Sequence, residues 1–160
     1  MLRANRSLAK YFFLSLLTFG IYGIVVMSHI SEEINKVASP RDGKKTMHYC
    51  LMFFLLTPIT LGIASLVWYH RLCNRMGAEL TARNLPYKFS AGTFWGWNIL
   101  GALLFGIGPL VFIHKLMKAM NFINGDYNAK LAAPAAAPAA APAPAPTAAP
   151  AEPAEPAEEA

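Results

Sequence analysis

Three long stretches of apolar side chains constrain this chain more than any other feature of its sequence. They cover Tyr11–Met27, Tyr49–Tyr69 and Phe94–Ile113, and no Asp, Glu, Lys or Arg interrupts any of them. A helix that crosses a bilayer needs about 20 mainly apolar residues. The stretches therefore predict an all-α integral membrane protein in the cell membrane, with three transmembrane or re-entrant segments. Aromatic rings near the segment ends, as expected where a membrane meets water, are Tyr11, Tyr49, Trp68, Tyr69, Trp95 and Trp97.

The three segments resemble one another around a glycine. Each has a glycine followed by isoleucine, a valine five residues after the glycine, and a histidine eight or nine residues after it. The glycines and histidines are Gly20, Gly62, Gly106, His29, His70 and His114. Shared residues at near-fixed offsets predict an internal repeat. We therefore expect a membrane domain over residues 1–131 with three repeats (about 8–38, 47–83 and 90–124), followed by a tail over 132–160.

Each apolar segment continues into a helix that is apolar on one face only. The apolar positions recur at helical spacing, with polar or basic residues between them. These positions are Ile30, Ile34, Val37, Leu72, Met76, Leu80, Leu116, Met120 and Ile123. An amphipathic helix of this kind either lies along a membrane surface or packs against a neighbouring helix, and the sequence supports both interpretations equally.

Each segment either crosses the bilayer once or bends at its glycine and returns to the same side. Pro58 and the run Gly106–Pro109 lie where a kink or a bend is expected. The distribution of basic residues does not distinguish these two architectures. Three spans would place seven Lys or Arg on each side of the membrane, whereas an excess is expected on the cytoplasmic side. Kinked spans are the more common architecture, and re-entrant hairpins explain the equal division of charge.

Several short motifs are, taken together, those of a known family. They are TFGIY (18–22), DGKKT (42–46), TLGI (60–63), VWYH (67–70), NRMGAEL (74–80), YKFSAGTFWGWN (87–98), GP (108–109), KAMN (118–121) and DYN (126–128). Through them, about residues 6–128 resemble the bacterial family called domain of unknown function 4234. The resemblance implies a small bacterial membrane protein, but no activity and no catalytic residues. The tail is not part of the family pattern.

Charge is divided unevenly along the chain. Residues 1–131 contain all 14 Lys and Arg residues and five acidic ones, a net charge of +9, whereas the tail contains four Glu and no base. A basic membrane domain predicts contact with the anionic headgroups of a lipid bilayer. No basic helix or stacking platform indicates nucleic-acid binding. The candidate lipid-facing bases are Lys44, Lys45, Arg71, Arg75, Lys115 and Lys118.

Small and polar residues within the segments are candidates for breaks in the helices or for close helix packing. These candidates are Gly20, Gly62, Gly106, Pro58, Pro109, Gly92, Gly96 and Asn98. Such residues serve packing within one chain or between chains. A homo-oligomer and an unidentified membrane protein partner therefore both stay open as predictions.

No pattern in the sequence indicates catalysis. A Ser/His/Asp arrangement, a Gly-x-Ser-x-Gly motif and paired carboxylates are missing, so we expect no enzyme and no cofactor. His70, Cys73 and His114 are weak metal candidates, because imidazole and thiolate bind transition metals but their spacing does not match a structural zinc site. The predicted function is a non-enzymatic structural or interaction module at the membrane. The alternative is a small oligomeric channel or transporter component.

The tail from residue 132 to residue 160 is almost entirely Ala, Pro and Glu. Proline interrupts helices, and these residues cannot form an apolar core. We therefore predict a disordered, extended arm that acts as a spacer.

Overall fold

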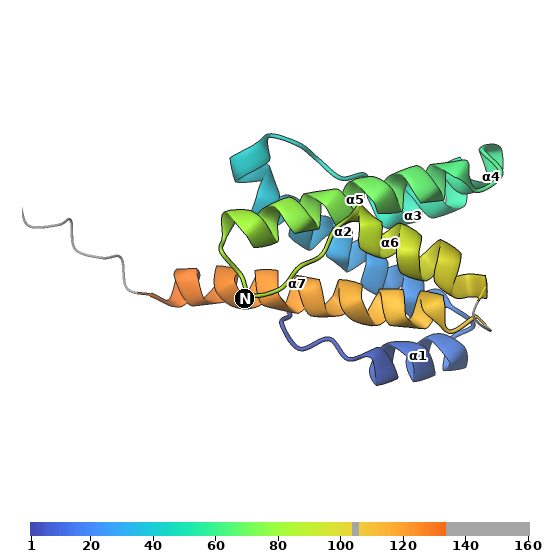
Figure 1. Ribbon diagram of the computed structural model, residues 1–160, viewed down its shortest axis with the longest axis horizontal. Helices are drawn as coiled ribbons and strands as arrows, with labels where there is room; N and C mark the ends of the chain where they lie inside the picture. The colour runs from blue at the N-terminus through green and yellow to red at the C-terminus, as the bar shows by residue number, and fades with distance from the viewer. Residues whose placement is uncertain (104–105, 134–160) are drawn as a thin grey trace, which may run out of the picture.

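The computed structural model describes residues 1–103 and 106–133, which form three helical hairpins in series (Figure 1). The first hairpin consists of α1 (Leu8–Leu17) and α2 (Ile21–Asp42). In the second, the first arm consists of α3 (Tyr49–Leu51), the π-helical η1 (Met52–Leu56) and α4 (Thr57–Ile59), and the second arm is α5 (Ile63–Ala82). In the third, the first arm consists of α6 (Ala91–Phe94), the π-helical η2 (Trp95–Ile99) and the 3-10 helix η3 (Leu100–Leu103), and the second arm is α7 (Gly108–Ala132). The predicted helical secondary structure is thus confirmed for the described residues. The predicted disordered tail lies, from residue 134 on, outside them.

The long second arms α2, α5 and α7 run in the same direction and pack against one another (Figure 1). Their apolar stripes face inward and form the core of the molecule. The nine stripe residues, each at most 4% exposed, are Ile30, Ile34, Val37, Leu72, Met76, Leu80, Leu116, Met120 and Ile123. The amphipathic helices are therefore packed against each other, which was one of the two alternatives that the sequence left open.

The first two hairpins reverse direction in the same way. Gly20 and Gly62 have φ angles of 90° and 93°, and the residues before them, Phe19 and Leu61, have φ angles of 51° and 49°. Two consecutive residues in the left-handed region turn the chain sharply, and glycine adopts this region without steric cost. Gly106, in the third hairpin, also has a positive φ of 75°.

A threonine supports each of the first two reversals. The hydroxyl of Thr18 donates to the carbonyl of Leu14 and accepts the backbone N–H of Tyr22. The hydroxyl of Thr60 makes the equivalent hydrogen bonds to Leu56 and Ala64. The shared Thr-x-Gly spacing therefore encodes one local structure twice, while the limits of the three predicted repeats stay a prediction.

The reversals also correct the predicted fold class. Among the described residues, no helix combines the length and the apolar character needed to cross a membrane. The predicted integral membrane fold, its transmembrane segments and its location in the cell membrane as a multi-segment integral protein are therefore wrong. The physical reason is that each apolar stretch is divided at its glycine: α1 has ten residues, about 15 Å at 1.5 Å per residue, and α2, α5 and α7 become polar beyond their first turns.

Candidate functional site

The three reversals bring exposed apolar side chains together at one end of the molecule, on the right in Figure 1, which we call the apolar end. Among the described residues it comprises 12–25, 51–67, 95–103 and 106–110. Phe19 and Leu61, at the first two reversals, are 98% and 94% exposed. Elsewhere in the described chain the exposed large apolar residues are Met1, Met47 and Leu131. So many exposed apolar side chains at one end of a protein usually mark an interaction site.

Basic side chains stand behind the apolar end at a common distance from the reversals. Each lies eight to ten residues from the nearest reversal glycine, or about 12–15 Å along a helix. We call this set the basic belt, and its members are Lys10, His29, His70, Arg71, His114 and Lys115. Lys10, His29, Arg71 and His114 are exposed, and the other two are half-buried.

Tryptophan rings contact the belt where the apolar end begins. The indole N–H of Trp95 donates to Nδ1 of His70 at 3.1 Å. Nζ of Lys115 lies 5.8 Å from the centroid of the Trp97 ring, within the range of a cation–π interaction. Indole combines an apolar body with one polar N–H, and such side chains suit a boundary between apolar and polar surroundings.

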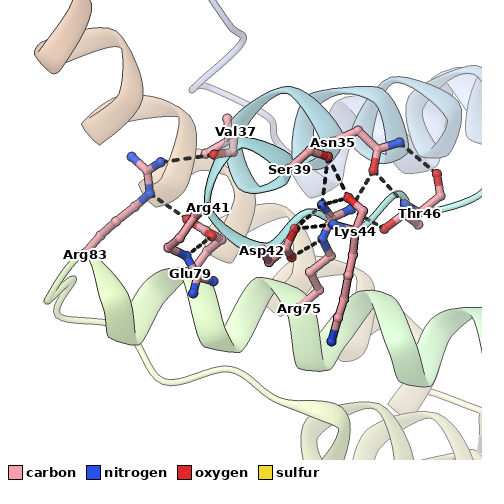
Figure 2. A network of polar contacts seen from close by, with 10 residues as sticks. All are labelled: Asn35, Val37, Ser39, Arg41, Asp42, Lys44, Thr46, Arg75, Glu79 and Arg83. Carbon is pink, nitrogen blue, oxygen red and sulfur yellow. Dashed lines mark hydrogen bonds and ion pairs between the residues drawn. The ribbon is translucent and has the colours of Figure 1, made fainter.

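A buried arginine, about one helical turn beyond Arg71 of the belt, ties the second hairpin to the first (Figure 2). Arg75 of α5 donates to both carboxylate oxygens of Asp42, at the end of α2, and to Asn35 and Ser39 on α2. It also donates to the hydroxyl of Thr46 and the carbonyl of Lys44, in the link that follows α2. The hydrogen bond from Arg75 holds the pKa of Asp42 below its usual value, so Asp42 stays ionised.

A second group of ion pairs joins all three long helices. Glu79 of α5, only 1% exposed, accepts from Arg41 of α2 at 2.6 Å and from Arg83 at 2.9 Å. Arg83 also pairs with Asp126 of α7, with Nη1 2.6 Å from Oδ2. A buried charge is costly unless it is paired. Glu79 and Arg83, at the end of α5, pair with each other and also with Arg41 of α2 and Asp126 of α7. The network therefore fixes how α2, α5 and α7 sit relative to one another.

The N-terminal segment before α1 is held by a row of asparagines on α7. The side-chain amide of Asn128 both accepts from and donates to the backbone of Leu2, and Asn121 does the same with Arg6. Asn124, between them, donates to the Arg3 carbonyl at 2.8 Å and to Oε2 of Glu33 at 2.6 Å.

Arg6 completes this contact by pairing with Glu33. Its Nη2 lies 2.7 Å from each carboxylate oxygen of Glu33, and both side chains are nearly buried. The ion pair connects the segment before α1 to α2, while Asn124 connects Glu33 to α7. All three hairpins are thus locked together at a distance from the apolar end.

The predicted lipid-facing bases occupy four different environments. Arg71 and Lys115 belong to the basic belt, and Lys118 lies about one turn farther along α7, with Nζ 5.6 Å from the centroid of the Tyr87 ring. Lys44 and Lys45 follow the end of α2 that is remote from the apolar end. Arg75 lies inside the protein, where it forms an ion pair with Asp42.

The predicted break and packing residues also divide into groups. Gly20, Gly62 and Gly106 lie at the reversals, Pro58 lies in α4, and Pro109 is in the first turn of α7, where a missing N–H donor costs nothing. Gly92 lies in α6, and Gly96 and Asn98 lie in η2. A Cβ at Gly96 would meet only open space, so Gly96 makes no close helix contact.

The glycines that do allow close approach were not found by sequence reasoning. A Cβ at Gly77 of α5 would collide with the carbonyl of Phe89, and a Cβ at Gly101 would lie 2.7 Å from Cα of Gly108. Each contact joins two separate elements or links of the chain, and neither follows from a regular spacing along one helix. No spacing rule would have identified them.

The weak metal candidates do not form a metal site in the structure. Cys73 is completely buried in the core, and burial raises the pKa of its thiol. His70 is instead hydrogen-bonded to Trp95. Within the described residues, no three side chains of His, Cys, Asp or Glu are grouped so that they could hold a metal ion.

Comparison with protein families confirms the resemblance drawn from the motifs over part of the chain. A family described as "Domain of unknown function (DUF4234)" matches residues 6–78. The match covers Arg6, the first hairpin and the second hairpin up to residue 78, one turn before the end of α5, including Glu33 and Arg75. The motifs of the third hairpin lie beyond the matched range. No curated protein and no solved structure gives a significant match to the chain.

Proposed function

We propose that this protein is a non-enzymatic interaction module that docks its apolar end into one leaflet of an anionic lipid bilayer, without any helix crossing that bilayer. The observation that carries the proposal is the separation of side-chain chemistry along the bundle. Exposed apolar residues surround the three reversals, basic residues follow at a common distance, and buried ion pairs lie farther back.

The shape of the apolar end favours lipid as the occupant. Its exposed side chains project from separate reversals, of which those at Phe19 and Leu61 are almost fully exposed. Acyl chains are fluid and fill the space around separate projections, whereas a folded partner would need a matching surface. The distance from the reversals to the belt, about 12–15 Å, is about half of the roughly 30 Å hydrocarbon core.

The basic belt favours an anionic lipid surface in particular. With the apolar end in the acyl region, Lys10, Arg71 and Lys115 would lie at the level of the headgroups, where each cation near an anionic surface contributes about 1 kcal/mol. Trp95 and Trp97 would lie at the same boundary, as interfacial tryptophans do. A second copy of this chain could cover the apolar side chains, but it would leave the belt without a counter-charge.

Flotation of the full-length protein with vesicles tests the proposal. We expect it to float with phosphatidylglycerol-containing vesicles and less with pure phosphatidylcholine. The double variant Phe19→Asp, Leu61→Asp should lose most of this binding. Asp tolerates the left-handed backbone at both positions, so the fold should survive, which circular dichroism checks. The control is Leu131→Asp, which introduces one aspartate at an exposed position outside the apolar end.

Two results would overturn the proposal. One is a wild-type protein that does not bind either vesicle. The other is a double variant that floats as well as Leu131→Asp. If a second copy covers the apolar end instead, sedimentation will show a dimer. The double variant will then be monomeric, and added vesicles will not dissociate the wild-type dimer. The channel or transporter component stays an alternative prediction, which dye or ion flux through protein-loaded vesicles tests separately.

A further inference from the structure

We infer that the docked protein senses and generates membrane curvature: it binds convex anionic surfaces more tightly than flat ones and bends a flat bilayer so that it sits on the convex face. The inference rests on the proposed docking and adds an activity to it. Three features of the described structure support it, namely the depth of the apolar end, its cross-section, and the rigid joining of the hairpins.

The depth restricts insertion to one leaflet. The apolar end reaches about 12–15 Å beyond the belt at 1.5 Å per residue, and one leaflet supplies about half of a roughly 30 Å core. The belt residues Lys10 and Arg71 are exposed, and moving these cations into the acyl region would be costly. They therefore stop the protein at the headgroups and keep it out of the opposite leaflet.

The cross-section makes the one-sided insertion large. Each hairpin contributes two arms, and an α-helix with its side chains is about 10 Å wide, or about 80 Å² in section. The arms of three hairpins thus add on the order of 500 Å² to one leaflet, and the opposite leaflet gains nothing. A bilayer relieves such a difference in area by curving toward the expanded leaflet, which is why binding by interfacial apolar elements depends on curvature.

The rigid joining prevents the hairpins from relieving this difference by spreading apart. Arg75 and Asp42 connect α5 to α2, and Arg83 and Asp126 connect α5 to α7. Arg6 and Glu33 fix the segment that leads into α1. The three pairs lie outside the proposed lipid zone, so the insertion of the apolar end leaves them intact. Bending and binding are linked: if the bound protein bends the bilayer, a bilayer that is already curved binds it more tightly.

The test compares small sonicated vesicles with large extruded vesicles of the same phosphatidylglycerol and phosphatidylcholine composition. Partition of the full-length protein is measured per unit of outer-leaflet lipid at low salt. We expect a several-fold preference for the small vesicles, and tubules or buds on large vesicles in electron micrographs at high coverage. The variant Phe19→Asp, Leu61→Asp keeps the belt, so its residual binding should show no preference for curvature. Leu131→Asp should behave like the wild type.

The outcomes separate the inference from the proposed function. Equal partition onto both vesicle sizes, with large vesicles that stay smooth, would overturn the inference and leave docking in place. Absence of binding to either size would overturn both. A preference for small vesicles that persists in the double variant would also overturn the inference, because it would then arise from charge rather than from the apolar end.

Discussion

Arg75 on α5 and Asp42 at the end of α2 form a two-point ion pair, with Nε 2.7 Å from Oδ2 and Nη2 2.9 Å from Oδ1. The two residues are 33 positions apart in the sequence. Their pairing fixes the second hairpin to the first, so it determines how the first two reversals are presented together at the apolar end.

Arg75→Ala should destabilise the fold strongly. It removes the charged partner of Asp42 and one hydrogen bond each from Asn35 and Thr46, and breaking a buried ion pair costs about 3–5 kcal/mol. Urea unfolding followed by circular dichroism measures the free energy of unfolding. Arg75→Lys should recover only part of the loss, because the lysine ammonium lacks the planar fork with which arginine donates to both carboxylate oxygens. The exposed Lys45→Ala is the control, and a loss for Arg75→Ala no larger than that of the control would contradict the role given to Arg75.

Stability should fall in acid. Arg75 lowers the pKa of Asp42 through its hydrogen bond. Burial raises the pKa of Asp126, but hydrogen bonds from Arg83 and Lys130 lower it more, so its net shift is also downward. Because both groups bind protons less readily when folded, their contribution is complete above the ordinary Asp pKa of 3.8 and disappears as the pH falls through their lower folded values.

Denaturant unfolding at several pH values checks this dependence. The free energy of unfolding should change little between about pH 7 and about pH 5 and then fall below about pH 4. The double variant Asp42→Asn, Asp126→Asn should start less stable and lose less on acidification. An acid-induced loss as large in the variant as in the wild type would show that other groups are responsible.

Gly62→Ala should destabilise the second reversal through its backbone alone. Gly62 has a φ of 93°, and a Cβ at this position would meet nothing within 4 Å. The left-handed conformation costs a residue with a Cβ about 1–2 kcal/mol, which thermal or urea unfolding can detect. Gly96→Ala is the matched control, because its Cβ also enters open space but its φ is not positive. Equal effects of the two substitutions would argue against backbone strain.

The double substitution Asn121→Ala, Asn128→Ala should release the N-terminal segment without unfolding the core. Each asparagine makes two hydrogen bonds to the backbone of that segment, and each such bond contributes about 0.5–1.5 kcal/mol. Hydrogen exchange at Leu2 and Arg6 should therefore accelerate, while exchange within α5 stays slow. Asn98→Ala, in η2 and outside the row, is the control. Unchanged protection of Leu2 would mean that the row does not hold the segment.

Much of the local structure could be predicted from the sequence. The stripe through Ile30, Ile34 and Val37, and its counterparts on α5 and α7, were assigned to one helix face, and all of these residues are buried. The glycines at positions 20, 62 and 106 were identified as breaks, and the chain has a positive φ at each. Such features depend on spacing and on single-residue conformational preferences, which are local properties of the chain.

The error in the fold class has a specific cause. Apolar content measured over Tyr11–Met27 or Tyr49–Tyr69 does not distinguish one helix of that length from two shorter arms joined at a glycine. The left-handed residues Phe19 and Leu61 decide between them, and nothing in a hydropathy pattern marks a non-glycine residue for a positive φ. The Thr-x-Gly spacing was visible, but its hydrogen bonds were not.

The sequence by itself therefore determined the helical segments, their apolar faces and the positions of the breaks, because these follow from the order of neighbouring residues. Tertiary structure alone decided that Arg75 points inward to Asp42, that Arg6 and Asn124 meet at Glu33, and that Gly77 allows contact with Phe89. Those contacts bring together residues from different hairpins and from the segments that precede or link them. Their energies depend on burial and on mutual geometry, which exist only once the three hairpins have packed.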